Sequence, residues 1–511
     1  MENRPQWGTR AGFILAAAGS AIGLGNIWRF PGVAYENGGG AFFLPYLIAL
    51  LTAGIPLLIL EFTMGHKYRG STPLSYARMN KKYEWVGWWQ VGIAFVISVY
   101  YAAIIAWAMS YSVFALNLKW GEDTGGFLFG DYLQLTDPGT VGSVVPGVFI
   151  PLLLVWAITL GVLFKGVKRG IELANRIFIP ALIILFFIIV IRALTLEGAV
   201  DGLNAFFKPD WGAISNGKVW VAAYGQIFFS LSIAFAIMIT YSSYLPKKSD
   251  VTNNAFITGF ANSSFELLAG IGVFSILGFL AMQSNADVSE VVSKGVGLAF
   301  VVFPAVINEL PALKGLFGFL FFGSLVLAGL SSLISIVETY VAGIQDKFKV
   351  SRTKAVAVGG GLSAVISILF ATQGGLWFLD VMDHFINSFG VALAGLVQII
   401  VVVWFAKEIK SLQAHANSVS DIKLTGLLGG WWKVSLAYIT PLILGYMMID
   451  NIIQNVQNVY GEGDGITRAF TIYFGWGVAA LAIIVGILFS RLKWSKDQLD
   501  IPQSSSKEVS K

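Results

Sequence analysis

The chain has 511 residues, of which 56% are hydrophobic and 12% charged, and its 34 Lys and Arg against 29 Asp and Glu give a net charge of +5. So little charge excludes a soluble globular protein, which could not cover its surface with polar groups. The absence of cysteine excludes disulfides, thiolate metal sites and cysteine nucleophiles.

Hydropathy predicts an all-α polytopic membrane protein whose spans each have about 20 residues or more. The first apolar stretch has no plausible signal-peptide cleavage site, so we expect it to be a span itself. We place twelve spans at residues 10–34, 41–66, 86–116, 146–164, 171–193, 219–245, 254–283, 317–346, 354–371, 377–406, 431–453 and 467–490.

The loops between these spans alternate in charge. Basic clusters such as Lys81-Lys82 and Lys165 to Arg169 fall on one side, and acidic residues such as Asp123 and Glu197 fall on the other. Because basic loops stay in the cytoplasm, this pattern predicts a multi-pass protein of the plasma or inner cell membrane with both termini cytoplasmic. The net charge therefore reflects membrane topology, and no nucleic-acid partner is expected.

Two spans are interrupted by glycine- or serine-rich sequence at their centres. The first interruption lies within residues 16–31 (AAAGSAIGLGNIWRFP) and the second within residues 225–235 (GQIFFSLSIAF). A broken helix frees backbone groups that lipid cannot satisfy, so these groups are expected to face a bound solute. Paired breaks in matching places are a sequence pointer to the binding site of a transporter.

The two breaks lie five spans apart, so the two halves have opposite orientations across the membrane. This predicts a 5+5 inverted repeat with two added helices. We divide the chain into a cytoplasmic segment at 1–9, repeats at 10–193 and 219–406, helices 11 and 12 at 431–490, and a polar, disordered cytoplasmic tail at 495–511.

Buried polar residues in the spans are candidate functional groups. We expect Glu61 to brace backbone groups freed by the breaks and leave Glu338 without a role. A small-residue face in span 8, with Ser331 and Ser332, is usual for helix packing, but opposite a broken helix it favours an oxygen shell for a hard cation.

The chain resembles the neurotransmitter:sodium symporter family, in particular its bacterial amino-acid transporters of the leucine-transporter type. The resemblance covers spans 1–10 and rests on GLGN at 23–26, WRFP at 28–31, ENGGGAF at 36–42, GIP at 54–56 with Glu61, the pair Tyr100-Tyr101, GQIFF at 225–229 and AGLSS at 328–332.

The resemblance implies two sodium sites. The first would use Ala21, Asn26, Ser230, Asn262 and the substrate carboxylate, and the second Gly19, Ile22, Ala328, Ser331 and Ser332. Neutral oxygens of this kind suit a monovalent hard ion.

The resemblance also implies the substrate. Glycine at position 23, where monoamine transporters of the family have aspartate, leaves room for the carboxylate of an amino acid. The pocket would be formed by Ala21, Gly23, Leu24, Gly25, Ile97, Tyr101, Phe229, Ser230, Ser232, Ala234, Phe235, Ser332 and Ile336. Because it is apolar and without a charged partner, we expect a neutral hydrophobic or aromatic amino acid, whose identity is left open.

Gates and anion dependence follow from the same resemblance. Arg29 and Asp383 would close the outer side, above a lid of Tyr101 and Phe235. The inner gate would contain Arg4, Trp7, Ser243, Tyr244 and Asp346. Glu266 stands where chloride-dependent members have serine, so chloride-independent transport is expected. Gly170 and Pro180 match a glycine-x9-proline motif at which span 5 unwinds to open a water path.

Other functions fit the sequence less well. A transporter-like sensor would be expected to carry long signalling domains, and the tail is short. An intramembrane enzyme needs a nucleophile or metal triad, but the histidines stand only at 66, 384 and 415. A channel needs a continuous selectivity filter rather than an occluding site. Monomeric and dimeric states both stay open.

Overall fold

The computed structural model describes residues 4–293 and 295–501. Within these residues the chain forms helices and two isolated β-bridges, Gly39 with Pro209 and Val144 with Thr372. The prediction of an all-α protein is confirmed.

Ten helical segments are long and apolar enough to cross a membrane, counted over the described residues. They are Gly40–Tyr68, Lys81–Ala115, Pro146–Phe164, Val167–Leu194, Val251–Gln283, Lys314–Phe348, Arg352–Ala371, Gly375–Phe405, Gly426–Asp464 and Arg468–Arg491. A further pair, Arg10–Ala21 with Leu24–Glu36, passes the same test only as one span bent by 54°.

The predicted span at 219–245 contains no single long helix. It is formed by α12 (Gly217–Ser230) and α13 (Ile237–Ser242), with non-helical residues between them. The predicted first span likewise consists of α1 (Arg10–Ala21), α2 (Leu24–Trp28) and α3 (Phe30–Glu36). The interruptions at residues 22–23 and 231–236 both overlap the sequences that suggested them.

The remaining spans are built from consecutive helices, several of them joined through wider or tighter turns. Their α-helices are α4 (Phe43–Ala49), α5 (Ile55–Tyr68), α7 (Glu84–Ala115), α9 (Pro146–Phe164), α10 (Leu173–Leu194), α14 (Val251–Gln283), α18 (Lys314–Phe348), α19 (Arg352–Ala355), α20 (Gly361–Ile366), α21 (Gly375–Phe385), α22 (Leu393–Ile399), α24 (Gly426–Val434), α25 (Thr440–Gln457), α26 (Arg468–Phe470) and α27 (Gly477–Arg491). The connecting segments add α6 (Thr72–Met79), α8 (Thr124–Gly126), α11 (Ala199–Phe207), α15 (Val288–Val291), α16 (Gly295–Gly297), α17 (Phe303–Glu309), α23 (Ile409–Val419) and α28 (Lys496–Leu499).

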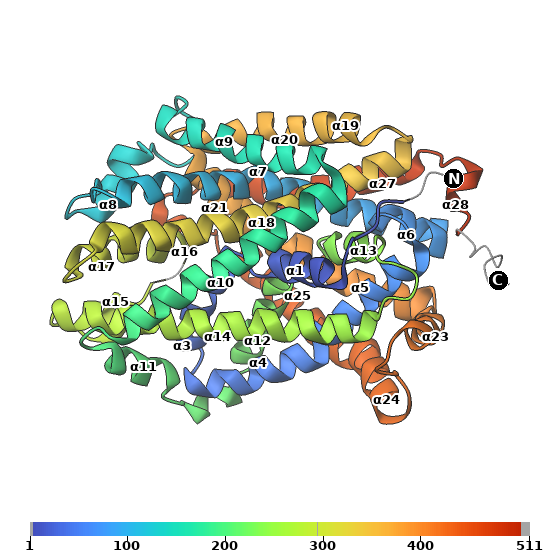
Figure 1. Ribbon diagram of the computed structural model, residues 1–511, viewed down its shortest axis with the longest axis horizontal. Coiled ribbons are helices and arrows are strands. Elements are labelled where there is room, and N and C mark those ends of the chain that lie inside the picture. Colours follow the sequence, from blue (N-terminus) through green and yellow to red (C-terminus); the bar gives the residue numbers. More distant parts are fainter. Residues whose placement is uncertain (1–3, 294, 502–511) are drawn as a thin grey trace.

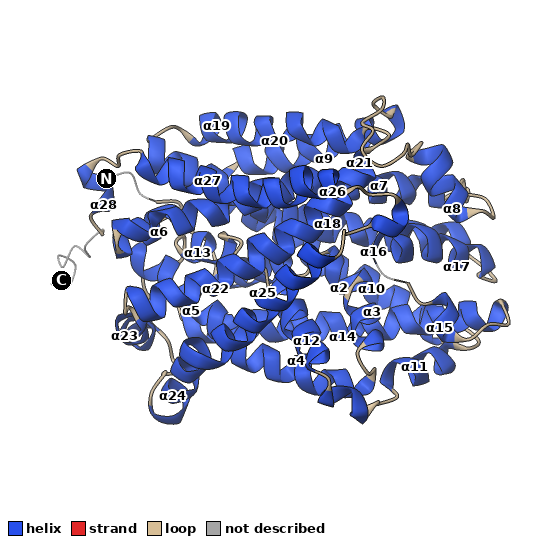
Figure 2. Cartoon of the chain, turned by 180° about the vertical axis from the view of Figure 1, so that it is seen from behind, coloured by secondary structure: helices blue, strands red, loops and turns tan. Residues whose placement is uncertain are grey.

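The interrupted helices lie inside the bundle, and the long helices run alongside them (Figure 1). Helix α1 contacts α10, α14 and α18, and α13 contacts α5 and α18. Seen from behind, α2 and α13 again lie among the other helices (Figure 2). Since residues 16–21 at the end of α1 and all residues of α2 and α13 are buried, the backbone groups freed at the breaks are shielded from lipid.

The N-terminal segment and α28 lie at the same end of the bundle in both views. Trp494 packs on Leu74 and Ala77, and Gln498 donates a hydrogen bond to the carbonyl of Asp346. These contacts explain why residues 496–499 are helical although the sequence predicted a disordered tail. Residues 502–511 of that predicted tail lie outside the described residues.

Candidate functional site

The first break brings backbone groups of Gly23 and Leu24 to the centre of the bundle. Gly23 is extended, with φ −118° and ψ −168°, and its N–H donates to Oδ1 of Asn26 over 3.0 Å. The Leu24 N–H points to the hydroxyl of Tyr101 over 3.4 Å. A Cβ added to Gly23 would lie 3.2 Å from both Ser332 Oγ and Tyr101 OH, so a larger residue at position 23 would narrow the space between them.

The second break is held in place by a buried carboxylate. Ser232, Ala234 and Ala236 all have left-handed φ angles, of 52°, 62° and 63°. Oε1 of Glu61 accepts the N–H of Ala234 over 2.9 Å, so Glu61 braces the break as expected. Ser232 Oγ donates to the carbonyl of Ser20 over 3.0 Å and joins the two breaks.

A cavity of about 200 Å³ lies between the breaks. It is lined by Ser20, Ala21, Gly23, Leu24, Gly25, Asn26, Trp28, Ile97, Tyr100, Tyr101, Ile104, Phe229, Ser230, Ser232, Phe235, Gly295, Val296, Ser332, Ile336, Leu379, Asp380, Asp383 and Asn387. This set contains every residue predicted for the substrate pocket except Ala234. The side chain of Ala234 does not line the cavity, because the left-handed turn directs its N–H to Glu61.

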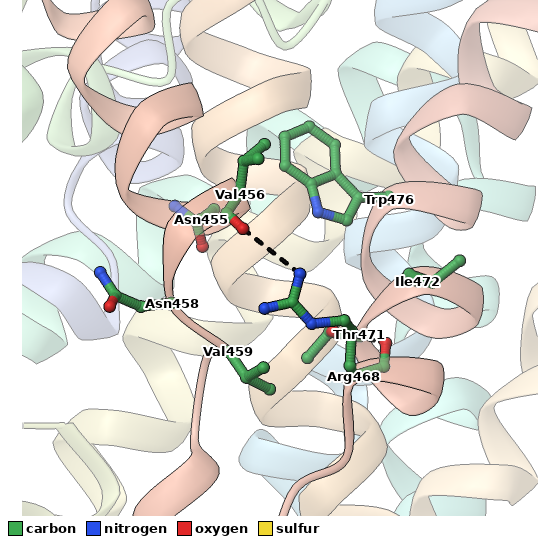
Figure 3. Close-up of a pocket in the computed structure, with 8 residues that line it drawn as sticks. All are labelled: Asn455, Val456, Asn458, Val459, Arg468, Thr471, Ile472 and Trp476. Carbon is green, nitrogen blue, oxygen red and sulfur yellow. Dashed lines mark hydrogen bonds between the residues drawn. The ribbon is translucent and has the colours of Figure 1, made fainter.

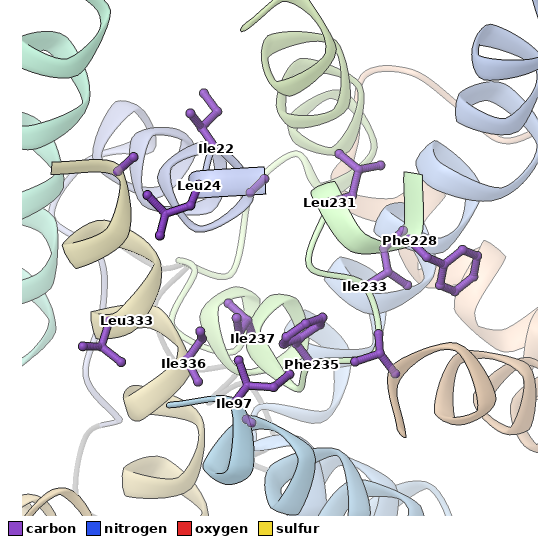
Figure 4. Close-up of a cluster of buried hydrophobic side chains, with 14 of the residues drawn as sticks. Ile22, Leu24, Ile97, Phe228, Leu231, Ile233, Phe235, Ile237, Leu333 and Ile336 are labelled. Carbon is purple, nitrogen blue, oxygen red and sulfur yellow. The ribbon is translucent and has the colours of Figure 1, made fainter. Parts of the chain in front are cut away.

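The cavity is apolar on one side and polar on the other. Figure 4 shows Ile97 of α7, Ile336 of α18 and Phe235, which lies between α12 and α13, close together, with Leu24 of the first break apart from them. Two carboxylates, Asp380 and Asp383 of α21, also line the cavity, although the sequence predicted no charged partner in the pocket.

The residues expected at the first sodium site form one hydrogen-bonded chain across three helices. Asn26 Nδ2 donates to Asn262 Oδ1 over 2.8 Å, and Asn262 Nδ2 donates to Ser230 Oγ over 3.1 Å. The carbonyl oxygen of Ala21 is 3.9 Å from the Cβ position of Gly23. Ala21, Asn26 and Ser230 also line the cavity.

The residues expected at the second sodium site come from α1, α18 and the residue after α1. Ser332 Oγ lies 3.4 Å from the carbonyl oxygen of Gly19. Ser331 Oγ would lie 2.5 Å from a Cβ on Gly19, so Ser331 is also directly against α1. Ala328 is buried on α18 and Ile22 follows the last residue of α1.

Glu266 is fully buried and is hydrogen-bonded to side chains of two neighbouring helices. Gln226 Nε2 of α12 donates to Oε1 over 2.7 Å, and the hydroxyl of Tyr46 of α4 contacts Oε2. The same tyrosine hydroxyl lies 2.8 Å from Ser263 Oγ. The carboxylate therefore sits among hydrogen-bond donors, as an anion would.

The predicted outer pair between Arg29 and Asp383 is not formed in this structure. The Arg29 guanidinium lies over the ring of Phe229, with its carbon 4.4 Å from the ring centroid. Asp383 instead accepts hydrogen bonds from Tyr100 OH over 2.7 Å and Asn387 Nδ2 over 2.9 Å. The cavity therefore reaches past the lid residues to the carboxylates of α21.

The residues predicted for the inner gate are in contact with one another or with their neighbours. Arg4 donates to both carboxylate oxygens of Asp346, over 3.1 and 3.0 Å, and to Ser243 Oγ over 3.0 Å. The Trp7 backbone N–H donates to the carbonyl of Tyr244 over 3.1 Å, and its indole N–H donates to the carbonyl of Tyr241 over 2.8 Å. The predicted inner pair is thus formed, whereas the predicted outer pair is not.

Comparison with known proteins identifies the fold and the family. A family model described as the sodium:neurotransmitter symporter family matches residues 4–128 and 132–497. The chain belongs to this family. The predicted family membership is confirmed.

Comparisons with individual proteins agree with this family assignment. An uncharacterized sodium-dependent transporter of Methanocaldococcus jannaschii is 42% identical over 494 residues, 96% of this chain and 99% of that protein. The human sodium- and chloride-dependent neutral and basic amino acid transporter B(0+) is 28% identical over 547 residues, 94% of this chain and 83% of that protein. The crystal structure of MhsT in complex with L-phenylalanine matches with a TM-score of 0.73 and 32% identity, covering 88% of this chain and 99% of that chain. These relatives are transporters, so the prediction that the chain is not an enzyme is confirmed.

Several polar contacts of this symporter could not be expected from the sequence interpretation alone. Tyr100, which holds Asp383, stood out in the sequence only as part of a Tyr-Tyr pair. Glu338 accepts hydrogen bonds from Tyr244 over 2.8 Å and from Arg352 over 3.0 and 2.7 Å. A carboxylate in an apolar span facing an arginine at the start of the next span was a usable signal for that pair.

A second cavity of about 190 Å³ lies at the end of the symporter opposite the inner gate, between α25 and the start of span 12 (Figure 3). Within it, Arg468 Nη1 donates to the carbonyl of Val456 over 3.3 Å. Trp476, which also lines it, packs on Phe385 and Phe389. This cavity shares no residue with the one between the breaks.

Proposed function

We propose that this symporter uses the sodium gradient to import a neutral, hydrophobic or aromatic L-amino acid by alternating access, without chloride. The observation that carries the proposal is the cavity between the two breaks, which combines polar groups of the first break with apolar side chains. Its volume of about 200 Å³ suits one small molecule. Such a site between broken helices is typical of secondary transporters.

The amino acid would bind with its carboxylate at the first break. The N–H groups of Leu24 and Gly25 begin helix α2, and the positive end of a helix favours an anion. Tyr101 OH is within reach of the same point. The substrate ammonium would be held by carbonyls of the breaks and by Ser232.

The substrate side chain would lie among Ile97, Phe229, Phe235 and Ile336. A charged side chain would lose its hydration there without gaining a partner. The related MhsT was crystallised with L-phenylalanine, which supports an apolar substrate for this chain. The acidic residues of α21 lie on the open side of the cavity, where they would attract the ammonium group on entry.

Sodium would be a co-transported substrate with two sites. The first would take Ala21, Asn26, Ser230, Asn262 and the substrate carboxylate, and the second Gly19, Ile22, Ala328, Ser331 and Ser332. Because the amino acid completes the first site, sodium and substrate each raise the affinity for the other. The closed inner pair and separated outer pair correspond to the outward-facing state in which both would load.

Chloride independence is proposed from Glu266. Its carboxylate already places a negative group among Tyr46, Gln226 and Ser263, so no chloride would be needed there. The human relative, whose name states chloride dependence, is only 28% identical and does not decide the matter for this chain.

The topology is proposed together with the function. Twelve spans, with spans 1 and 6 broken, would form inverted repeats at 10–193 and 219–406, followed by helices 11 and 12 at 431–490. The basic loops place both termini in the cytoplasm and the protein in the cell membrane. The common position of the N-terminal segment and α28 supports this arrangement.

The experiment is uptake of radiolabelled amino acids into proteoliposomes containing the purified protein. An inward sodium gradient is expected to drive accumulation of a subset of neutral amino acids, identified by competition among all twenty. Equal uptake with potassium replacing sodium on both sides would contradict the proposal. Sodium-dependent binding without uptake would indicate the sensor instead.

A further inference from the structure

Asn175 of α10 connects two parts of the molecule that the sequence did not link. The side chain is fully buried, and both of its polar atoms are used. Ser331 Oγ donates to its Oδ1 over 2.6 Å, while its own Nδ2 donates to the carbonyl of Ile171 over 2.9 Å. One amide thus bridges span 8 and the beginning of span 5.

One end of this bridge reaches the expected second sodium site. A Cβ added to Gly19 would lie 2.5 Å from Ser331 Oγ and 2.7 Å from Asn175 Oδ1, so all three groups meet against α1. A hydroxyl has one hydrogen and two lone pairs. With its hydrogen directed to Asn175, Ser331 can turn its lone pairs toward a cation.

The other end reaches the first turn of span 5. Ile171 belongs to a wide, π-helical turn at Val167–Glu172, a type of turn that is frequent at functional sites. In the same turn, Glu172 accepts the Gly8 N–H over 2.6 Å and the Thr9 hydroxyl over 2.8 Å. The turn therefore holds the residues that begin span 1, next to the inner gate.

We propose that Asn175 is a positioning residue of the second sodium site, which orients the Ser331 hydroxyl and links sodium occupancy to the first turn of span 5. This rests on the proposed function. A bound cation repels the hydroxyl hydrogen and leaves Asn175 as its acceptor. When the ion leaves, the hydrogen is free to turn elsewhere, and span 5 loses its hydrogen bond from Ser331 of α18. By linkage, loosening this turn weakens sodium binding.

The alternative is that Asn175 is only a hydrogen bond between two helices, as polar residues in membrane bundles often are. That role would affect the folded protein as a whole and would not depend on Ser331. The two roles are separated by sodium binding in single and double variants.

The test is equilibrium binding of radioactive sodium to the purified full-length protein. Removing a group that orients a metal ligand lowers metal affinity about 10- to 100-fold, and we expect a loss of that order in N175A. N175D keeps an oxygen acceptor for the Ser331 hydroxyl but loses the donor to Ile171, so its loss of affinity should be smaller than that of N175A. In the S331A background, N175A should cause no further loss.

Controls distinguish a local effect from misfolding. N308A removes another amide, which bonds to Trp120 over 2.9 Å far along the chain, and should leave sodium affinity unchanged. Wild-type affinity in N175A, equal losses in N175A and N175D, or a full further loss in the S331A background would each overturn the inference. Absence of sodium binding by the wild-type protein would instead overturn the proposed function.

The link between sodium binding and the first turn of span 5 is tested by measuring the alkylation rate of a single introduced cysteine. Because the chain has no cysteine, A16C in the buried part of α1 would be its only thiol. Sodium is expected to slow alkylation of A16C. This protection should be lost in the double variant A16C/N175A and kept in the double variant A16C/N308A. Full sodium protection in the N175A background would contradict the link.

Discussion

Arg4 and Asp346 form a two-pronged ion pair, in which one guanidinium nitrogen lies 3.1 and 3.0 Å from the two carboxylate oxygens. Asp346 also accepts the backbone N–H of Ser71 over 2.7 Å. The pair therefore fastens the N-terminal segment to the ends of α18 and α6. It is partly exposed, with side-chain exposures of 20% and 18%, so its contribution to the closed state is about 1 kcal/mol.

We predict that D346N opens the inner side. A loss of about 1 kcal/mol raises the ratio of open to closed molecules roughly fivefold. Alkylation of A16C should therefore be several times faster in D346N than in the parent protein. D497N, which removes the exposed pair with Lys349, is the matched control and should leave the rate unchanged. An unchanged rate in D346N would show that the pair does not hold the gate.

The carboxylate of Glu172 is predicted to keep the start of α1 in place. E172A removes the acceptor for both Gly8 and Thr9, and hydrogen bonds to a charged group contribute about 1.5–3 kcal/mol each. We expect faster alkylation of A16C and a lower melting temperature in detergent. E172Q keeps an oxygen for the Gly8 N–H and an amide for the Thr9 hydroxyl, so it should lie close to the wild type. If E172Q were as affected as E172A, charge rather than hydrogen bonding would be responsible.

Replacement of Glu266 is predicted to create an anion requirement. E266S leaves the donors Tyr46 and Gln226 facing a space without negative charge. Sodium-driven uptake should then become dependent on chloride, whereas wild-type uptake in gluconate equals that in chloride. The measurement is initial uptake rate against chloride concentration. Chloride stimulation of the wild-type protein would contradict the role given to Glu266.

The pH dependence of stability is predicted to include a contribution from His415. Burial, together with the charges of Lys67 and Arg69, lowers the pKa of His415 from 6.5 to about 4. The unfolded chain binds this proton near pH 6.5, so between pH 6.5 and 4 it holds more protons than the folded protein. Stability therefore falls as the pH drops through this window.

H415Q tests this contribution. His66 Nδ1 lies 2.9 Å from His415 Nε2, and the side-chain amide of glutamine can donate or accept in place of His415. The melting temperature of H415Q should fall less than that of the wild type between pH 6.5 and 4.5. Parallel melting curves for the two proteins over this range would rule the contribution out.

Hydropathy was enough to place the spans. The predicted span at 146–164 coincides with α9, and most other long spans differ from the helices by a few residues at each end. The predicted span at 431–453 is the exception, because it lies within the longer helical segment Gly426–Asp464. Lipid imposes this agreement, because a continuous apolar stretch must satisfy its own backbone hydrogen bonds. Every residue that the family motifs assigned to the pocket lines the cavity except Ala234, whereas other lining residues, such as Leu379 and Asp380, were not assigned to it.

Contacts between distant side chains could not be read in the same way. Hydropathy reports how deep Asn175 and Glu338 lie, but not which neighbouring helix each faces. The separation of Arg29 from Asp383 depends on the position of Arg29 over Phe229 and on the bond from Tyr100 to Asp383, and hydropathy reports neither. None of the left-handed residues at 232, 234 and 236 is glycine, so the sequence did not indicate their backbone conformation. It showed this segment only as a serine-rich interruption of the span.

That run of alternate left-handed residues also constrains how the transporter moves. Each non-glycine residue in this conformation costs on the order of 1–2 kcal/mol, and the bond from Ala234 to Glu61 opposes any return to a regular helix. Rewinding would need three backbone flips and the release of a buried carboxylate in one step. We therefore expect residues 231–236, between α12 and α13, to stay non-helical throughout the transport cycle. Each of the two helices would then tilt as a rigid body about this segment.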